Sequence, residues 1–312
     1  MKLKNALIFG ITGQDGIYLS KFLSEKKHYK IFGVTRNLSQ ISDFKKKILK
    51  DNNVTLIEIN LNHYNISSLI NKILPHEIYN LAGISSVGYS FRYPKKTFNS
   101  IVDLNIILLE ILRKNKKIKL FIASSCDCFG DTKNSIATEN TLFKPLSPYG
   151  IAKTTAYNLS NFYRKNYGVF VCSGILSNHE SKLRTDIFVT KKIISSVINI
   201  SKGSKEKLKL GDLSIIRDWG FAEDYVEAMW LMLQQKKSNN FIIATGKSYS
   251  LQDFVDKAFG AFNLDWSKYV IIDKNLFRTN ELKVSNVSPA KAKRELSWEA
   301  KTNFNELIYK LM

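Results

Sequence analysis

The chain has 312 residues, enough for one large or two smaller domains, and its 44% hydrophobic content is ordinary for a globular protein. Its three cysteines form no CxxC pair, its four histidines show no metal-ligand spacing, and no stretch approaches the roughly 18 apolar residues of a membrane span. We therefore expect no disulfide framework, no metal site and no membrane segment, and a reducing cytoplasm is the expected compartment.

The 47 Lys and Arg residues against 27 Asp and Glu residues give a net charge of +20. The lysines are scattered in short runs, and no single basic block occurs. Scattered charge favours electrostatic attraction of an anionic substrate over a nucleic-acid-binding stripe. Nucleic-acid binding stays open as an alternative at this point.

Short apolar runs alternate with amphipathic segments up to Leu176. This pattern predicts strands over residues 4–9, 30–35, 54–59, 77–81, 119–123 and 170–175, and helices over 16–26, 65–74, 99–113 and 152–166. Buried strands separated by helices of this length predict an α/β fold with a Rossmann-type, doubly wound parallel sheet.

The pattern is less regular after Leu176. Residues 178–185 are polar and predict a loop, a last sheet strand is expected at 241–245, and helices are expected at 188–202, 224–234, 251–262 and from Pro289. These elements predict two interleaved domains. Residues 1–176 with about 219–246 form a nucleotide-binding domain, and residues 177–218 with 247–312 form a smaller, discontinuous C-terminal domain.

The sequence GITGQDG over residues 10–16 joins the first expected strand to the first expected helix. Glycines at this spacing permit a tight turn and a close approach of backbone to a pyrophosphate, and the helix N-terminus that follows stabilises the phosphates. Glycine patterns also occur in structural turns. The position between a strand and a helix predicts a dinucleotide site here.

The second expected strand ends at Thr35 and is followed by Arg36, without the carboxylate that usually binds the ribose 2′-hydroxyl of NAD. A guanidinium at this place can pair with a 2′-phosphate, which favours NADP. The alternative is a solvated surface arginine.

Two groups of polar residues follow later in the chain. Ser125 and Asp127 stand just after the fifth expected strand, where ligands bind in parallel sheets, so the hydroxyl can donate to a substrate oxygen and the carboxylate can move a proton. A turn or a helix cap is the alternative there. Tyr149 and Lys153 are spaced i, i+4 on one helical face. A phenol is a poor base at neutral pH because its reference pKa is about 10, but a neighbouring ammonium lowers that pKa.

Together these motifs resemble the extended short-chain dehydrogenase/reductases, and within them the GDP-mannose 4,6-dehydratase family. The similarity runs nearly end to end, through residues 6–16 (ALIFGITGQDG), 77–82 (EIYNLA), 147–153 (SPYGIAK), 174–181 (GILSNHES), 188–193 (FVTKKI), 217–220 (RDWG) and 224–234 (DYVEAMWLMLQ). The Asn-His-Glu-Ser segment and the last run are specific to this branch.

The resemblance implies an NADP-dependent lyase of deoxysugar biosynthesis. Tyr149 takes the proton of the sugar 4-hydroxyl while hydride leaves C4, a carboxylate removes the C5 proton, the 6-hydroxyl leaves as water, and hydride returns to C6. The product is a GDP-4-keto-6-deoxy sugar. Ser125 polarises the 4-oxygen, and Lys153 holds the nicotinamide ribose.

The resemblance also implies the binding residues of an NADP-binding and a nucleotide-sugar-binding domain. The expected cofactor residues are Gly10, Thr12, Gly13, Gln14, Asp15, Gly16, Arg36, Asn60, Leu61, Leu81, Ala82, Tyr149, Lys153 and His179. The expected residues for the GDP-sugar are Ser85, Asn178, Val189, Lys192, Arg217, Arg278 and Glu281.

The sequence departs from the family at several positions. The C5 base is Asp127 where the family has Glu, and Ile59-Asn60 replaces a glycine–aspartate pair. The segment between Arg36 and Val54 is shorter than the family's, where it supports a tetramer, so a homodimer is expected with a tetramer as the alternative.

Residues 181–185 (SKLRT) replace the pattern Ser-x-Arg-Arg-Gly, so the sugar pocket differs and the substrate is GDP-mannose or a related GDP-sugar. The alternative activity is a GDP-4-keto-6-deoxy-sugar reductase or epimerase, which needs Ser125, Tyr149 and Lys153 but no C5 base. A third interpretation is a non-catalytic nucleic-acid-binding protein on this fold, and the intact set of these three residues argues against it.

Overall fold

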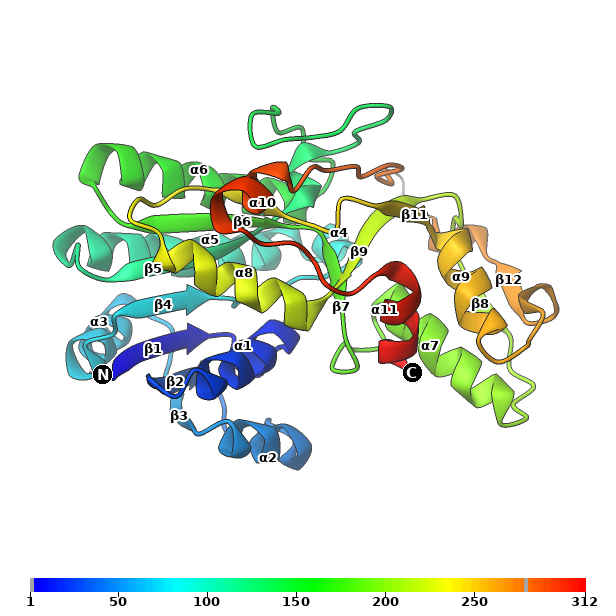
Figure 1. Cartoon of the computed structure of the whole chain (residues 1–312), viewed down its shortest axis with the longest axis horizontal. Coiled ribbons are helices and arrows are strands. Elements are labelled where there is room, and N and C mark those ends of the chain that lie inside the picture. Colours follow the sequence, from blue (N-terminus) through cyan, green and yellow to red (C-terminus); the bar gives the residue numbers. More distant parts are fainter. Residues whose placement is uncertain (1–2, 278–279) are drawn as a thin grey trace. The chain divides into compact units, whose positions relative to one another are not determined.

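The computed structural model describes residues 3–277 and 280–312 of the chain (Figure 1). The chain divides into two compact units. The first unit comprises Met1–Ser125, Pro148–Ile175 and Val226–Phe241, and the second comprises Cys126–Ser147, Leu176–Tyr225 and Ile242–Met312. No helix of the described residues is long and apolar enough to cross a membrane.

A seven-stranded sheet, with strand order β10-β6-β5-β4-β1-β2-β3, forms the centre of the first unit. β1 pairs in parallel with β2 and with β4, and β2–β3 and β4–β5 are parallel as well, so the predicted Rossmann-type fold class is confirmed. The strands are β1 (Lys4–Phe9), β2 (Tyr29–Thr35), β3 (Val54–Glu58), β4 (Glu77–Asn80), β5 (Lys119–Ser125), β6 (Val171–Leu176) and β10 (Phe241–Ile243).

Helices flank this sheet. They are α1 (Gln14–Glu25), α2 (Asp43–Asp51), α3 (His63–Ile73), α4 (Val87–Arg92), α5 (Pro94–Lys114), α6 (Pro148–Tyr167) and α8 (Ala222–Gln234). α1 and α8 touch through Phe22 and Trp230 and lie in front of the strands in Figure 1. α5 begins five residues before its predicted start because Pro94, whose fixed φ suits a first helical turn, opens it.

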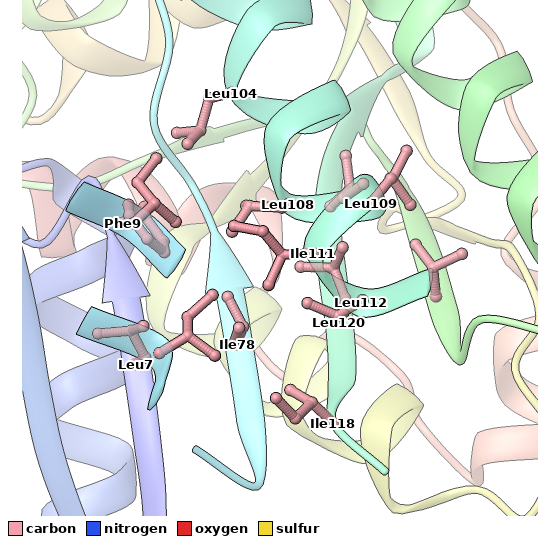
Figure 2. Close-up of a cluster of buried hydrophobic side chains, with 14 of the residues drawn as sticks. Leu7, Phe9, Ile78, Leu104, Leu108, Leu109, Ile111, Leu112, Ile118 and Leu120 are labelled. Carbon is pink, nitrogen blue, oxygen red and sulfur yellow. The ribbon is translucent and has the colours of Figure 1, made fainter. Parts of the chain in front are cut away.

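The main core lies between the sheet and helices α3, α5 and α6. Leu7 and Ile78 from the strands meet Leu108 and Leu112 from α5, and all four side chains are fully buried. Figure 2 shows these side chains pointing toward one another between the ribbon of α5 and the strands. The apolar spacing of residues 104, 108, 111 and 112 predicts this contact, because residues three and four apart share one helical face.

The second unit contains two small sheets, ordered β11-β9-β7 and β12-β8. Its elements are η1 (Cys126–Phe129), β7 (Asn178–Glu180), α7 (Val189–Ser201), β8 (Leu208–Leu210), β9 (Ile216–Phe221), β11 (Ser248–Ser250), α9 (Leu251–Gly260), η2 (Trp266–Lys268), β12 (Val270–Ile272), η3 (Lys274–Leu276), α10 (Ala290–Leu296) and α11 (Phe304–Leu311). The prediction of a loop at residues 178–185 was wrong for the first three residues. Asn178–Glu180 is a strand because it pairs in parallel with β9, a partner distant in sequence.

A buried carboxylate holds the amino ends of three strands of the first unit together. Glu77 of β4 accepts hydrogen bonds from Tyr79 at 2.8 Å and from Tyr29 at 3.0 Å, and it forms an ion pair with Lys4 at 3.1 Å. Trp230 of α8 donates to the Tyr29 oxygen at 2.8 Å. Burial, and then the Glu77 carboxylate, raise the pKa of both phenols, so both hydroxyls stay protonated and donate.

We expect Glu77→Ala to lower the free energy of unfolding by about 3 kcal/mol, because it leaves the buried Tyr79 hydroxyl and the half-buried Tyr29 hydroxyl without their acceptor and removes the ion pair of Lys4. Tyr79→Phe removes one donor and should cost about 1 kcal/mol. Urea titration followed by circular dichroism measures both values. Equal stability of Glu77→Ala and the parent chain would show that this network contributes nothing to the fold.

Candidate active site

The glycine loop turns sharply between β1 and α1. Gly10 has φ +82°, and a Cβ at this residue would lie 2.7 Å from the carbonyl carbon of Leu81 and 2.8 Å from the amide nitrogen of Ala82. A Cβ at Gly16 would lie 2.4 Å from the carbonyl oxygen of Gly10. Only glycine fits at both positions, because of the left-handed φ and the backbone contacts at Gly10 and because of the backbone contacts at Gly16.

The loop opens directly into α1, whose N-cap is Gly13. Gly13 donates its N–H to the Gly10 carbonyl at 3.0 Å, and no side chain caps the start of the helix. An uncapped helix N-terminus presents backbone N–H groups and the positive end of the helix dipole, which is the arrangement that binds a phosphate. The residues of the loop therefore fit the pyrophosphate of a dinucleotide.

The other predicted cofactor residues of the first unit follow the carboxyl ends of neighbouring strands. Arg36 follows β2, Asn60 and Leu61 follow β3, and Leu81 and Ala82 follow β4. These strands and β1 are adjacent and parallel, so their carboxyl ends share one edge of the sheet. Arg36 is exposed there.

Sequence reasoning missed a buried amide pair that supports this edge. Asn80, the last residue of β4, donates to the Asn105 side chain at 2.8 Å, and Asn105 donates to the Ile101 carbonyl at 2.7 Å. The Asn80 side-chain oxygen also accepts the N–H of Ala82 at 3.2 Å. The sequence signal for this pair is Asn105, a polar residue inside the apolar stretch Leu104–Leu109 of α5, because a buried amide needs hydrogen-bond partners.

Ser125, Tyr149 and Lys153 all belong to the first unit and all are buried. Ser125 is the last residue of β5, which extends two residues beyond its predicted end. Tyr149 and Lys153 lie in the first turns of α6, which begins at Pro148, four residues before its predicted start. Tyr149 packs on Ile101 and Val102 of α5, which fixes the phenol against a second helix.

A backbone carbonyl orients the lysine of this group. The ammonium of Lys153 donates to the Ala123 carbonyl of β5 at 2.6 Å, and it lies 5.7 Å from the centre of the Tyr149 ring. This bond connects α6 to the strand that ends at Ser125. The hydrogen bond and the i, i+4 spacing therefore bring the hydroxyl-bearing strand end, the phenol and the ammonium together.

Asp127 lies in η1, the single 3₁₀ turn that directly follows β5, and belongs to the second unit. Both of its neighbours in the chain, Cys126 and Cys128, are buried. Burial raises the pKa of the Cys126 thiol well above its ordinary value, so this thiol is protonated and is no nucleophile at neutral pH. Asp127 carries the carboxylate of this turn.

The predicted substrate residues of the second unit lie on several of its elements. Asn178 begins β7, and Val189 begins α7, where Lys192 donates to the Lys209 carbonyl at 2.6 Å. Arg217 of β9 forms an ion pair with Glu281 at 3.3 Å and donates to the Leu282 carbonyl at 2.5 Å. The structure thus brings Arg217 and Glu281 together. Ser85 lies in the first unit, and Arg278 lies outside the described residues.

His179, the one predicted cofactor residue of the second unit, is held by a buried polar chain. Its ring stacks on Tyr225 with centres 4.7 Å apart, and its Nδ1 lies 2.7 Å from the Ser177 carbonyl. A carbonyl only accepts, so this bond places the proton on Nδ1. The hydroxyl of Ser177 contacts the Tyr225 hydroxyl at 2.5 Å and Asp218 at 3.0 Å. Burial raises the pKa of the Asp218 carboxyl.

Comparison with solved structures shows the fold. The crystal structure of dTDP-glucose 4,6-dehydratase from Bacillus anthracis in complex with NAD matches with a TM-score of 0.86 and 21% identity, covering 99% of this chain and 95% of that chain. UDP-glucose 4-epimerase from Thermus thermophilus, in complex with NAD, matches with a TM-score of 0.86 and 20% identity, covering 98% and 97%. The fold is thus that of the nucleotide-sugar dehydratases and epimerases.

Sequence comparison shows the family. The family model described as GDP-mannose 4,6 dehydratase matches residues 7–311. GDP-mannose 4,6 dehydratase 1 of Arabidopsis thaliana is 39% identical over 318 residues, which cover 98% of this chain and 88% of that protein. The chain belongs to the GDP-mannose 4,6-dehydratase family, and the resemblance read from its motifs is confirmed.

We expect Gly16→Ala to weaken dinucleotide binding by more than tenfold, because its Cβ would meet the Gly10 carbonyl and displace the loop. Gly260→Ala is the matched control, since nothing lies within 4 Å of a Cβ at that position. Calorimetric titration with NADP⁺ measures both variants. Unchanged affinity in Gly16→Ala would place the dinucleotide elsewhere.

Proposed function

We propose that the protein is a nucleotide-sugar 4,6-dehydratase that converts GDP-mannose or a related GDP-sugar to the GDP-4-keto-6-deoxy sugar. The observation that carries this proposal is the family match over nearly the whole chain, together with a buried serine, tyrosine and lysine at the end of β5 and the start of α6. The reaction has no net redox change, so it needs no added reductant.

NADP, when bound, accepts the hydride from C4 and later returns it to C6. In this proposal the phenolate of Tyr149 takes the proton of the 4-hydroxyl, while Ser125 donates a hydrogen bond to the same oxygen. The ammonium of Lys153 stabilises the phenolate and holds the nicotinamide ribose. Asp127 then removes the C5 proton, which the 4-ketone has acidified. Of the two protons that Tyr149 and Asp127 have taken from the sugar, one leaves with the 6-hydroxyl as water and the other returns to C5 when hydride is added to C6.

The preference for NADP over NAD is part of the proposal. Arg36 supports it, because this residue is exposed directly after β2, where a carboxylate would serve the 2′-hydroxyl of NAD. The loop residues Gly10, Thr12, Gly13, Gln14, Asp15 and Gly16 would hold the pyrophosphate, with Asn60, Leu61, Leu81, Ala82 and His179 completing the site.

We further propose that the first unit carries the cofactor and that the second carries most of the sugar nucleotide. Lysine and arginine side chains at Lys192, Arg217 and Arg278 suit the diphosphate, and Asn178, Val189, Glu281 and Ser85 suit the base, ribose and sugar. The guanidinium of Arg217 already binds Glu281 and three backbone carbonyls, which holds it in one orientation before a ligand arrives.

A 4-keto reductase or epimerase acting on a GDP-sugar is the second candidate. Asp127 favours it, since a carboxylate one C–C bond shorter than the family's glutamate, about 1.5 Å, is less suited to reach C5. A reductase or epimerase needs Ser125, Tyr149 and Lys153 but no C5 base.

A homodimer in a reducing cytoplasm is the proposed state of the enzyme. Phe98 and Ile106 of α5 and Ile151 and Phe162 of α6 are exposed, and between residues 150 and 163 α6 has no charged side chain except the buried Lys153. Such a face is unusual on a chain of charge +20 and suits contact with a second copy. A monomer in sedimentation velocity at micromolar concentration would contradict this proposal.

We expect the purified protein to form a 4-keto-6-deoxy product from GDP-mannose without added NADPH, as mass spectrometry would show. Asp127→Asn should still oxidise C4 and accumulate NADPH, seen at 340 nm, but should incorporate no solvent deuterium at C5, because an amide accepts no proton. A 6-deoxy product absent from the parent, with only modest losses in Asp127→Asn, would identify a reductase or epimerase instead.

Tyr149→Phe should lower the turnover rate by about 10²–10⁴, because it removes the acid–base group at the 4-oxygen. Cofactor affinity should remain near the parent value in this variant. Lys153→Met should lower both the rate and the affinity for NADP⁺. Steady-state kinetics together with calorimetry separate the two effects, and normal turnover by Tyr149→Phe would refute its assignment.

A further inference from the structure

A lysine from outside the recognised motifs reaches the glycine loop. The ammonium of Lys45 donates a hydrogen bond to the Thr12 carbonyl at 2.8 Å. Lys45 is half-buried, whereas Lys47 and Lys50 of the same helix are exposed. All of these residues belong to the first unit.

Local helix energetics do not explain this lysine. Lys45 is the third residue of α2, in the first turn, where the helix dipole disfavours a cation. Its side chain turns away from solvent to a loop carbonyl 33 residues earlier in the chain. A cation at such a position gains most where a negative charge arrives beside it.

Chain connectivity places Lys45 near Arg36. β1 and β2 pair in parallel with Phe9 opposite Val34, so the glycine loop and Arg36 both follow carboxyl ends of adjacent strands. α2 begins at Asp43, seven residues after Arg36, and this short connection returns its first turn to the glycine loop.

The remaining polar groups around this connection already have partners. The carboxylate of Glu58, at the end of β3, accepts the N–H of Leu38 at 2.6 Å. The side chain of Asn37 accepts from the N–H of Ser39 at 2.8 Å and from its hydroxyl at 2.7 Å. The charge of Glu58 is thus directed to the backbone, and Asp43, the exposed carboxylate of the first turn of α2, pairs with Lys46 at 3.7 Å and not with Lys45.

We propose that Lys45 is a second specificity-determining cation, which binds the 2′-phosphate of NADP together with Arg36. An ammonium has three donors, so one N–H can stay on Thr12 while another binds a phosphate oxygen. The 2′-hydroxyl of NAD has no charge to gain from it. This inference rests on the proposed NADP dependence and deepens it.

Calorimetric titration of the whole protein with NADP⁺ and with NAD⁺ tests the inference. Lys45→Met should weaken NADP⁺ binding about tenfold and leave NAD⁺ binding nearly unchanged, because a charge-assisted hydrogen bond to phosphate is lost. The dependence of NADP⁺ affinity on salt concentration should also become shallower.

Three further variants serve as controls. Lys47→Met removes the same charge from the same helix, about 200° around its axis, and should change neither affinity. Lys45→Arg keeps the cation and should preserve most of the preference for NADP⁺. If Lys45→Met does not fold, Lys45→Gln provides the same comparison, because it removes the charge and keeps an N–H donor.

The outcomes distinguish this inference from the proposed cofactor. An equal loss for NADP⁺ and NAD⁺ in Lys45→Met would mean that Lys45 only supports the loop, and no loss for either would exclude it from the site. Both results would overturn the inference while the parent still prefers NADP⁺. A parent chain without that preference would overturn the assignments of Lys45 and Arg36 together.

Discussion

The sheet edge that carries the predicted cofactor residues depends on one constraint. Three backbone segments approach one another closely at the end of β1. Gly10 lies against the backbone of Leu81 and Ala82, and Gly16 lies against the carbonyl of Gly10. A side chain at Gly10 would separate the turn from the end of β4, and one at Gly16 would separate α1 from the turn. Because the helix dipole and backbone N–H groups act only over a short distance, such a displacement would weaken the binding of a phosphate at this helix N-terminus.

The group formed by Ser125, Tyr149 and Lys153 depends on one further hydrogen bond. Lys153 reaches across to the Ala123 carbonyl, so the strand that ends at Ser125 and the helix that carries Tyr149 are fixed to each other within the first unit. In the proposed reaction, the same lysine supplies the positive charge that stabilises the phenolate of Tyr149. The packing of Tyr149 on Ile101 and Val102 limits the ring to one orientation, which proton transfer over a short distance requires.

The sequence predicted the elements whose signals are local. The strands of the first unit and its helices α1, α3, α5, α6 and α8 follow from their apolar periodicity, and the glycine loop and the Tyr149–Lys153 pair follow from short spacings. α2 was missed because residues 43–51 include six lysines and aspartates and only three apolar residues, which masks the helical period. β7 was missed because its pairing with β9 lies about 40 residues away. The Glu77 network and the Asn80–Asn105 pair need tertiary contacts that no window of sequence contains.

The sequence departs from the family pattern at positions that neighbour the candidate site residues in the chain. The residues that fix the geometry of the site are unchanged. Ser125, Tyr149 and Lys153 are unchanged, whereas Asp127 is shortened and residues 181–185 differ. Oxidation at C4 is therefore the best-supported step, and removal of the C5 proton is the step most exposed to these changes. The short connection after Arg36 has an opposite effect, since it brings α2 to the glycine loop and adds a cation there. A change in the length of one loop can thus add a side chain to the site without moving the other groups, because the parallel strands keep one common edge for all of them.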